Sequence, residues 1–212
     1  MKPSVALKTL VGAATLALPL MASAESNVQS GAATAAPGAT AHVDFSIVIP
    51  KILYLRVGTG SSYTTGALTS NGAIDLVTFS PTAAQVGNGT AVAGTGGDLT
   101  GGVETAAIVS NSGNVTLNAT ATGPLTDGNG DSIPFSQITT TATTLTSATA
   151  LPAPTLTNAT SANVVLTAPA TKVIVQDAKW TFAYANAAMV PSGTYGGVNT
   201  NGGRVVYTAT MP

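Results

Sequence analysis

The residues best suited to binding an ion lie in one short loop, DGNGDS. Asp127, Asn129 and Asp131 occupy alternate positions there, which is how a loop directs oxygen atoms at calcium. An EF-hand would also need Gly at its sixth position and Glu at its twelfth, where this chain has Ser132 and Ile138. We therefore interpret the loop as a hairpin turn built on Asx and Gly conformations, with a calcium site as the alternative.

A second candidate for chemistry is His42, the only histidine, which lies two positions before Asp44. In an extended segment both side chains project from the same face, and no nucleophile is implied beside them. The eight Asp and Glu residues are scattered rather than paired, which gives no support for a glycosidase dyad. Cysteine is absent, which excludes thiol catalysis, zinc–thiolate sites and iron–sulfur clusters. We expect no enzyme activity, no catalytic residue and no cofactor.

Aromatic side chains in the last third of the chain could stack on a sugar. At least two of Trp180, Tyr184 and Tyr195 would have to be exposed on one face to form a platform for a pyranose. Trp180 and Phe182 share strand parity, however, which is more typical of a core. We favour the core, and a carbohydrate-binding adhesin module is the alternative function.

The first 24 residues have the three parts of a secretory signal peptide. Lys2 and Lys8 make a basic start, residues 9–21 are apolar but too few to span a bilayer, and the sequence ASA ends at Ala24. We predict cleavage before Glu25 and export from a bacterium through the periplasm to the cell surface or the medium. No later segment has the ~18 consecutive apolar residues of a transmembrane helix, so we expect no stable membrane insertion.

Charge is scarce throughout the chain. Only 7% of the residues are charged, against about 25% in ordinary domains. After removal of the signal peptide, five basic and eight acidic residues remain, which is a formal net charge of −3. That balance offers no electrostatic footprint for nucleic acid. It also weakens repulsion between copies, which suits a protein that packs against itself or against a matrix.

The run HVDFSIVIPKILYLRVG, residues 42–58, concentrates the large apolar side chains of the chain. It keeps a period of two, which is the period of a strand, and Pro50 excludes a helix. Pro50 belongs on a sheet edge or at a bend. We predict two strands, or one long strand kinked at Pro50, whose odd face supplies much of the core. The odd positions are Val43, Phe45, Ile47, Ile49, Lys51, Leu53, Leu55 and Val57, of which only Lys51 is not apolar.

Further strand-length segments follow at the spacing of an all-β sandwich, separated by turns rich in Gly and Asn. We find no convincing amphipathic helix, and residues 81–87 allow at most one turn. The chain is therefore predicted to be all-β, with an antiparallel sandwich over residues 42–212 and a flexible arm over residues 25–41. The further strands are predicted within residues 72–79, 103–110, 114–121, 132–140, 162–168, 171–185 and 203–211.

Residues 191–212, PSGTYGGVNTNGGRVVYTATMP, resemble the closing hairpin of secreted bacterial pilin-type and spore-coat-U-type subunits. The sequence NSGNVTLNATATGPLTD, followed by SIPFSQI, resembles their central strands. The resemblance implies a single immunoglobulin-like sandwich that is exported to the surface and whose subunits associate through strand exchange. Those families commonly carry a disulfide, and this chain has none.

A mobile arm in front of a sandwich suggests how copies would associate. An unpaired sheet edge is a template for another molecule's strand. We predict residues 25–41, continuing into residues 43–49, as the donor, with Val43, Phe45, Ile47 and Ile49 as the assembly residues. The expected function is that of a structural subunit of a cell-surface filament, pilus-like fibre or extracellular matrix. Its expected partners are copies of itself or other surface proteins, with a glycan as the alternative ligand and no nucleic acid.

Overall fold

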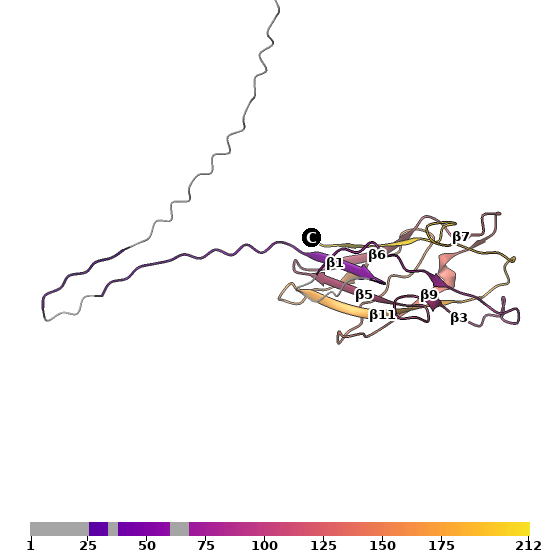
Figure 1. The fold of residues 1–212 in the computed structure, drawn as a ribbon, viewed down its shortest axis with the longest axis horizontal. Coiled ribbons are helices and arrows are strands. Elements are labelled where there is room, and N and C mark those ends of the chain that lie inside the picture. The colour runs from indigo at the N-terminus through magenta and orange to yellow at the C-terminus, as the bar shows by residue number, and fades with distance from the viewer. Residues whose placement is uncertain (1–25, 34–37, 60–67) are drawn as a thin grey trace, which may run out of the picture. The chain divides into compact units, whose positions relative to one another are not determined.

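The structure is a computed structural model, and it describes residues 26–33, 38–59 and 68–212. The signal peptide predicted for residues 1–24, and part of the predicted arm, lie outside the described residues. The chain divides into two units, Met1–Ile49 and Pro50–Pro212. The described residues of the first unit form no helix or strand and are all exposed. Every strand of the described chain belongs to the second unit (Figure 1).

The larger sheet is built around two long strands, β5 and β11. The strand β5 (Val103–Ser110) pairs with β1 (Leu53–Val57) on one side and with β11 (Ile174–Tyr184) on the other. The strand β11 also pairs with β9 (Ile138–Thr143) and with the short β3 (Val92–Ala93). All of these pairings are antiparallel. In the strand order β1-β5-β11-β3, β1 lies at one edge of this sheet.

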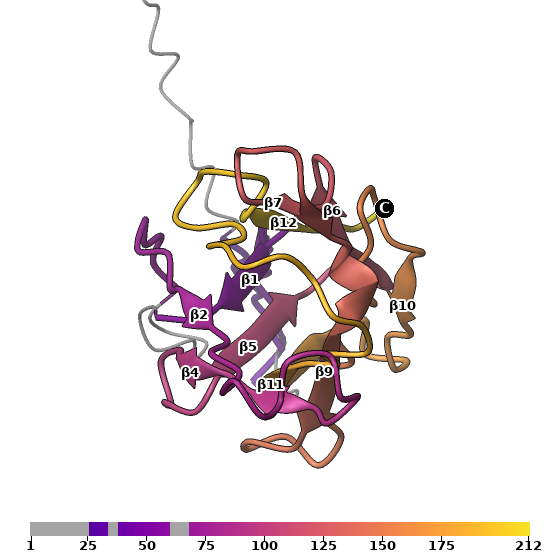
Figure 2. The ribbon, with the colours of Figure 1, turned by 90° about the vertical axis from the view of Figure 1, so that its right-hand side faces the viewer.

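The smaller sheet has the order β10-β6-β12 and is also antiparallel. Its central strand β6 (Val115–Ala121) pairs with β10 (Val164–Leu166) and β12 (Val205–Thr210). Figure 2 shows the two sheets as the layers of a sandwich, with β12 next to β1. The chain is thus an all-β antiparallel sandwich, as the sequence predicts.

Two short hairpin-like pairs and one helical turn complete the second unit. The strand β2 (Val77–Thr78) pairs with β4 (Thr95–Gly96), and β7 (Leu125–Thr126) pairs with β8 (Ser132–Ile133). A 3-10 helix, η1 (Phe135–Gln137), connects β8 to β9.

The core lies between the two sheets and follows the alternation of the sequence. Along β6, Val115, Leu117 and Ala119 are buried, while the intervening polar residues are half-buried. On β11 the side chain of Trp180 is fully buried, and Phe182 is nearly so. The parity of these two aromatic residues therefore predicted the core correctly.

Trp180 also ties the sheets to the long connection between β9 and β10. Its indole Nε1 donates a hydrogen bond to the carbonyl oxygen of Leu151, at 2.8 Å, so the polar atom of this side chain is satisfied inside the core. Its ring lies 5.3 Å from the ring of Tyr207 on β12, measured between centroids. One aromatic contact thus joins β11 of the larger sheet to β12 of the smaller one.

Three predicted strands differ from the observed structure. The strand predicted within residues 132–140 is interrupted by η1. Of the run in residues 43–57, only β1 is a strand; residues 43–49 form none and are exposed, so the prediction that they supply core is wrong. Within residues 72–79 only β2 is a strand. A period of two describes a side-chain pattern, whereas a strand also needs a neighbouring edge for its backbone hydrogen bonds. The compact unit accordingly begins at Pro50, eight residues after the predicted boundary at residue 42.

Among the described residues, none of the helical structure is long and apolar enough to cross a membrane.

Replacement of Leu117 by alanine should destabilise the sandwich, because this side chain is fully buried in the core. We expect the free energy of unfolding to fall by about 2–5 kcal/mol. Val165→Ala is the control on the neighbouring strand β10, where the side chain is 58% exposed, and it should change that energy by less than about 0.5 kcal/mol. Urea unfolding followed by Trp180 fluorescence measures both. Equal effects of the two substitutions would contradict the assigned core.

Candidate functional site: an open groove beside β12

A groove of about 440 Å³ opens between the first half of β12 and residues 73–79. Its volume falls in the range of about 300–1,000 Å³ that is usual for binding pockets. Side chains from both sheets line it, and most are apolar. The apolar lining includes Val57, Val77, Phe79, Phe182, Val205 and Tyr207.

The strand that borders this groove has a partner on one side only. In the part of the chain that the structure describes, β12 pairs with β6, and no strand pairs with its other edge. Its exposed positions alternate with half-buried ones, and Val206 is 52% exposed. An edge strand of this kind presents backbone N–H and C=O groups that can pair with another strand. The site therefore combines an apolar groove with an open hydrogen-bonding edge.

A pair of acids, Asp75 and Glu104, forms part of the groove wall. Glu104 is on β5, at the same parity as the buried Ala106 and Ile108, and it is only 5% exposed. Burial, followed by the negative charge of Asp75, raises the pKa of Glu104 to about 7. The protonated carboxyl of Glu104 donates a hydrogen bond to the carboxylate of Asp75.

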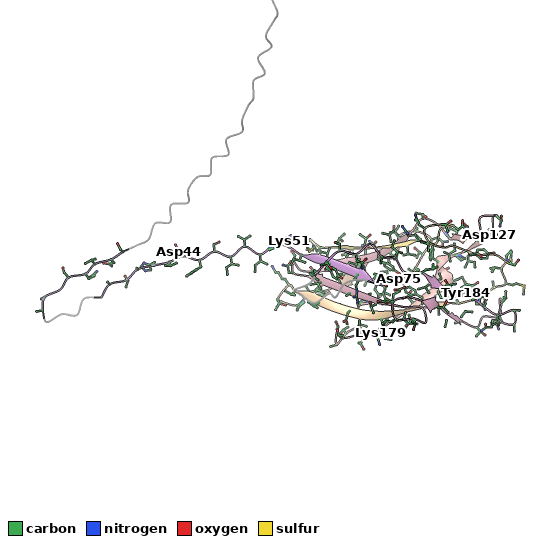
Figure 3. The ribbon with its side chains drawn as sticks, viewed as in Figure 1. Asp44, Lys51, Asp75, Asp127, Lys179 and Tyr184 are labelled. Atoms are coloured by element: carbon green, nitrogen blue, oxygen red, sulfur yellow. The ribbon has the colours of Figure 1, made fainter. Side chains whose placement is uncertain are left out.

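Asp75 stays ionised in this pair. Burial alone would raise its pKa, but hydrogen bonds from Thr59 and Glu104 outweigh burial and hold the pKa below its usual value. The backbone N–H of Thr59 and its hydroxyl, the latter at 2.8 Å, both donate to the Asp75 carboxylate. Gly58 makes room for this arrangement at a φ of +81°, since a Cβ there would collide with both carboxyl groups. Figure 3 shows where Asp75 lies on the domain.

A third acid, Asp98, fixes the strand end that carries Glu104. Its carboxylate accepts hydrogen bonds from the backbone N–H of Thr105, at 2.7 Å, and from the Thr105 hydroxyl. The backbone N–H of Asp98 donates to Glu104 at 3.3 Å. Arg56 on β1 donates to the Thr105 hydroxyl at 2.7 Å. These contacts hold Glu104 in place at the wall of the groove.

The sequence alone did not single out this acid pair. Glu104 does leave one signal, because it is a carboxylic acid at a position whose neighbours i+2 and i+4 are apolar. Asp75 leaves none, since it belongs to a segment 29 residues earlier that only the fold brings to β5.

Asp127, Asn129 and Asp131 lie in a turn, which is the interpretation that the sequence favours over a calcium site. Asp127 accepts hydrogen bonds from the backbone N–H groups of Asn129 and Asp131, at 2.8 and 3.1 Å, and from the amide of Asn129 at 3.2 Å. These hydrogen bonds, above all that of the Asn129 backbone, lower the pKa of Asp127. The carboxylate of Asp127 thus stabilises the turn between β7 and β8 (Figure 3). Among the described residues, no group of three or more His, Asp or Glu side chains could hold a metal ion.

The aromatic platform that a glycan-binding module needs does not form. Trp180 is fully buried and Tyr184 is 7% exposed, which leaves Tyr195, half-buried, as the accessible member of the three. The hydroxyl of Tyr195 donates to the carbonyl of Pro191 at 2.9 Å.

His42 and Asp44 belong to the first unit, where both are exposed. The structure describes no helix or strand around them that would position a catalytic pair.

The predicted assembly residues lie in the same unit as a stretch of exposed apolar side chains. We call residues 43–49 the donor segment. Its five large apolar residues are 74–90% exposed: Val43, Phe45, Ile47, Val48 and Ile49. Monomeric proteins rarely keep so many large apolar side chains together in water, and such stretches mark interaction sites.

Comparison with protein-family models, with curated proteins and with solved structures gives no match to this chain. The function of this chain therefore has to be argued from its own residues and geometry.

The stability of the sandwich should depend on pH through Glu104. Its pKa is about 7 in the folded chain, against an ordinary value of 4.5 that applies to the unfolded chain. Between these two pH values the folded state therefore binds more protons than the unfolded state. The free energy of unfolding should therefore fall as pH rises from about 5 to about 8, by at most about 3 kcal/mol. Denaturant unfolding at a series of pH values measures this slope.

Glu104→Gln isolates the contribution of this residue, because glutamine keeps a hydrogen-bond donor and does not titrate. We expect the variant to lose most of the slope. Asp131→Asn, in the turn between β7 and β8, is the matched control and should keep it. An identical slope in all three proteins would show that Glu104 is not the group that titrates.

Proposed function

We propose that the chain is an exported structural subunit of a surface filament, pilus-like fibre or extracellular matrix. The donor segment of one copy adds as a strand to the open edge of β12 in the next copy. Its apolar face fills the groove there. The observation that carries the proposal is the exposure of five large apolar side chains in a segment that alternates like a strand.

Burial of these side chains supplies the driving force. Removing apolar surface from water is worth about 25 cal/mol per Å², or about 1.5–3 kcal/mol for each large side chain that becomes fully buried. Val43, Phe45, Ile47 and Ile49 are on one face of an extended chain, because alternate residues of a strand point the same way. A groove lined by valine and phenylalanine side chains offers that face a matching environment.

The backbone favours the same site. A strand added along β12 pairs its N–H and C=O groups with those of an edge that has no strand partner among the described residues. Such hydrogen bonds depend little on sequence, so they give the contact strength, while the groove selects for an apolar face.

Hydrogen bonds fix the chain at the start of the second unit, directly after the donor segment. The side chain of Asn111 accepts a hydrogen bond from the N–H of Ile52 and donates one to the carbonyl of Pro50, both at 2.8 Å. The ammonium of Lys51 donates to the carbonyl of Pro212 at 2.9 Å.

Scarce charge removes an obstacle to repeated association. The mature chain would have a formal net charge of −3, and only 7% of all residues are charged. Copies of such a protein repel one another weakly, so a modest apolar contact can hold them together.

The double variant Phe45→Asp/Ile47→Asp in the full chain should abolish assembly, because it places two charges on the face that enters the groove. Electron microscopy and light scattering should show polymers of the wild-type protein and monomers of the variant. Met189→Asp is the control, since Met189 is also a large exposed apolar side chain (78%) but lies outside residues 25–49 and does not line the groove, and this variant should still polymerise.

The same double variant also tests the direction of assembly. It keeps an intact β12 edge, so added to wild-type protein it should accept a donor, offer none, and shorten the polymers. The Met189→Asp variant should instead join the polymers without shortening them. A wild-type chain that stays monomeric at high concentration would overturn the proposal.

A further inference from the structure

Residues 73–79 lie along the groove, and they would have to move to admit an added strand. Residues 73–79, which we call the strap, line the groove through most of their length. The strap is packed thinly at its middle, where Ile74 is 63% exposed and Leu76 is 47% exposed. Only its last part is held in a sheet, through the two-residue pair of β2 with β4.

The middle of the strap is fastened by Asp75. This residue accepts two hydrogen bonds from Thr59, which follows β1, and one from Glu104, which joins the strap to β5. The contact with Glu104 requires a proton, because two carboxylates cannot share a hydrogen bond without one.

The charges around Glu104 make its ionisation unfavourable. Asp75 acts on it from the strap and Asp98 from the turn after β4, and both are negative. Tyr207 on β12 is close enough to Glu104 for the two to interact electrostatically. Of the cations near the site, Arg204 lines the groove and Arg56 bonds to the neighbouring Thr105.

We propose that the Asp75–Glu104 pair is a proton-dependent latch, which holds the strap along the groove while the proton is present. When the proton is lost, the strap opens and the groove admits the donor segment of a second copy. This inference rests on the proposed function, because it assumes that the groove is the acceptor.

The sense of the switch follows from charge. Loss of the proton from Glu104 replaces a hydrogen bond with two facing carboxylates, and Asp98 adds to the repulsion. Opening the strap exposes Glu104 to water and separates it from Asp75. The open form is therefore favoured as pH rises through about 7, and assembly should be restrained in acid and released in mild alkali.

The test measures binding of the donor segment alone. The acceptor is the full chain with Phe45→Asp/Ile47→Asp, which cannot polymerise, and the probe is a labelled synthetic peptide of residues 43–50, which contains no histidine. Fluorescence anisotropy should give a dissociation constant that falls on the order of tenfold between about pH 5.5 and about pH 8.5. Glu104→Gln in the acceptor should bind the peptide weakly at both pH values, because its amide donates to Asp75 throughout.

The controls separate the latch from the acceptor itself. Asp131→Asn in the acceptor should keep the full pH dependence. Equal affinity at both pH values would overturn the latch and leave the proposed function intact. No binding at either pH, together with wild-type protein that stays monomeric, would overturn the proposed function and the latch with it.

A second measurement reads the strap without any donor. Amide hydrogen exchange of residues 73–79 should be faster in the acceptor than in its Glu104→Gln form at about pH 8.5, and equal in the two at about pH 5.5. If Glu104→Gln does not fold, Asp75→Asn replaces it and should shift the change in exchange to lower pH, because the charge that raises the pKa of Glu104 is gone. Exchange that is the same in acceptor and variant at both pH values would contradict the latch.

Discussion

The proposed site depends on one edge strand that borders an apolar groove. The last strand, β12, has β6 on one side and, within the described residues, no strand on the other. Unpaired N–H and C=O groups keep their demand for partners, and here they border a groove lined by apolar side chains. Water can satisfy the backbone groups but not the groove. An extended segment with one apolar face would satisfy both at once, which is why the two requirements point to the same kind of occupant.

The open groove also accounts for an acid on the core face of β5. Glu104 continues the row of Ala106 and Ile108, yet a charge inside a closed core would carry a large desolvation penalty. At the groove wall protonation of Glu104 avoids this penalty. Its carboxyl donates to Asp75 and accepts a hydrogen bond from the backbone N–H of Asp98. Gly58 then becomes necessary, because any side chain there would displace the pair. The groove thus allows the acid pair on the core face of β5, and the acid pair in turn requires glycine at position 58.

Much of the sandwich could be predicted from side-chain periodicity. The alternation of Val115, Leu117 and Ala119 identified β6 and its buried face, and the shared parity of Trp180 and Phe182 identified the core face of β11. The acid pair could not be found in this way, since the fold alone brings Asp75 to Glu104. Residues 72–79 show the other limit: their apolar pattern predicts a strand, but only Val77 and Thr78 pair with a strand, β4.

The run around Pro50 shows why the pattern predicts a strand in residues 43–49 where the structure has none. Its two halves have the same period of two, yet the half after Pro50 is β1, paired with β5, while the half before it forms no strand. Side-chain pattern cannot distinguish the two halves, because a strand needs a partner segment, and among the described residues only the half after Pro50 pairs with one. Asn111 bonds to Pro50 and Ile52 where the two halves meet. A segment that has the pattern of a strand, is exposed and pairs with no strand among the described residues is suited to a sheet edge in another molecule, and β12 is the edge strand that borders the apolar groove.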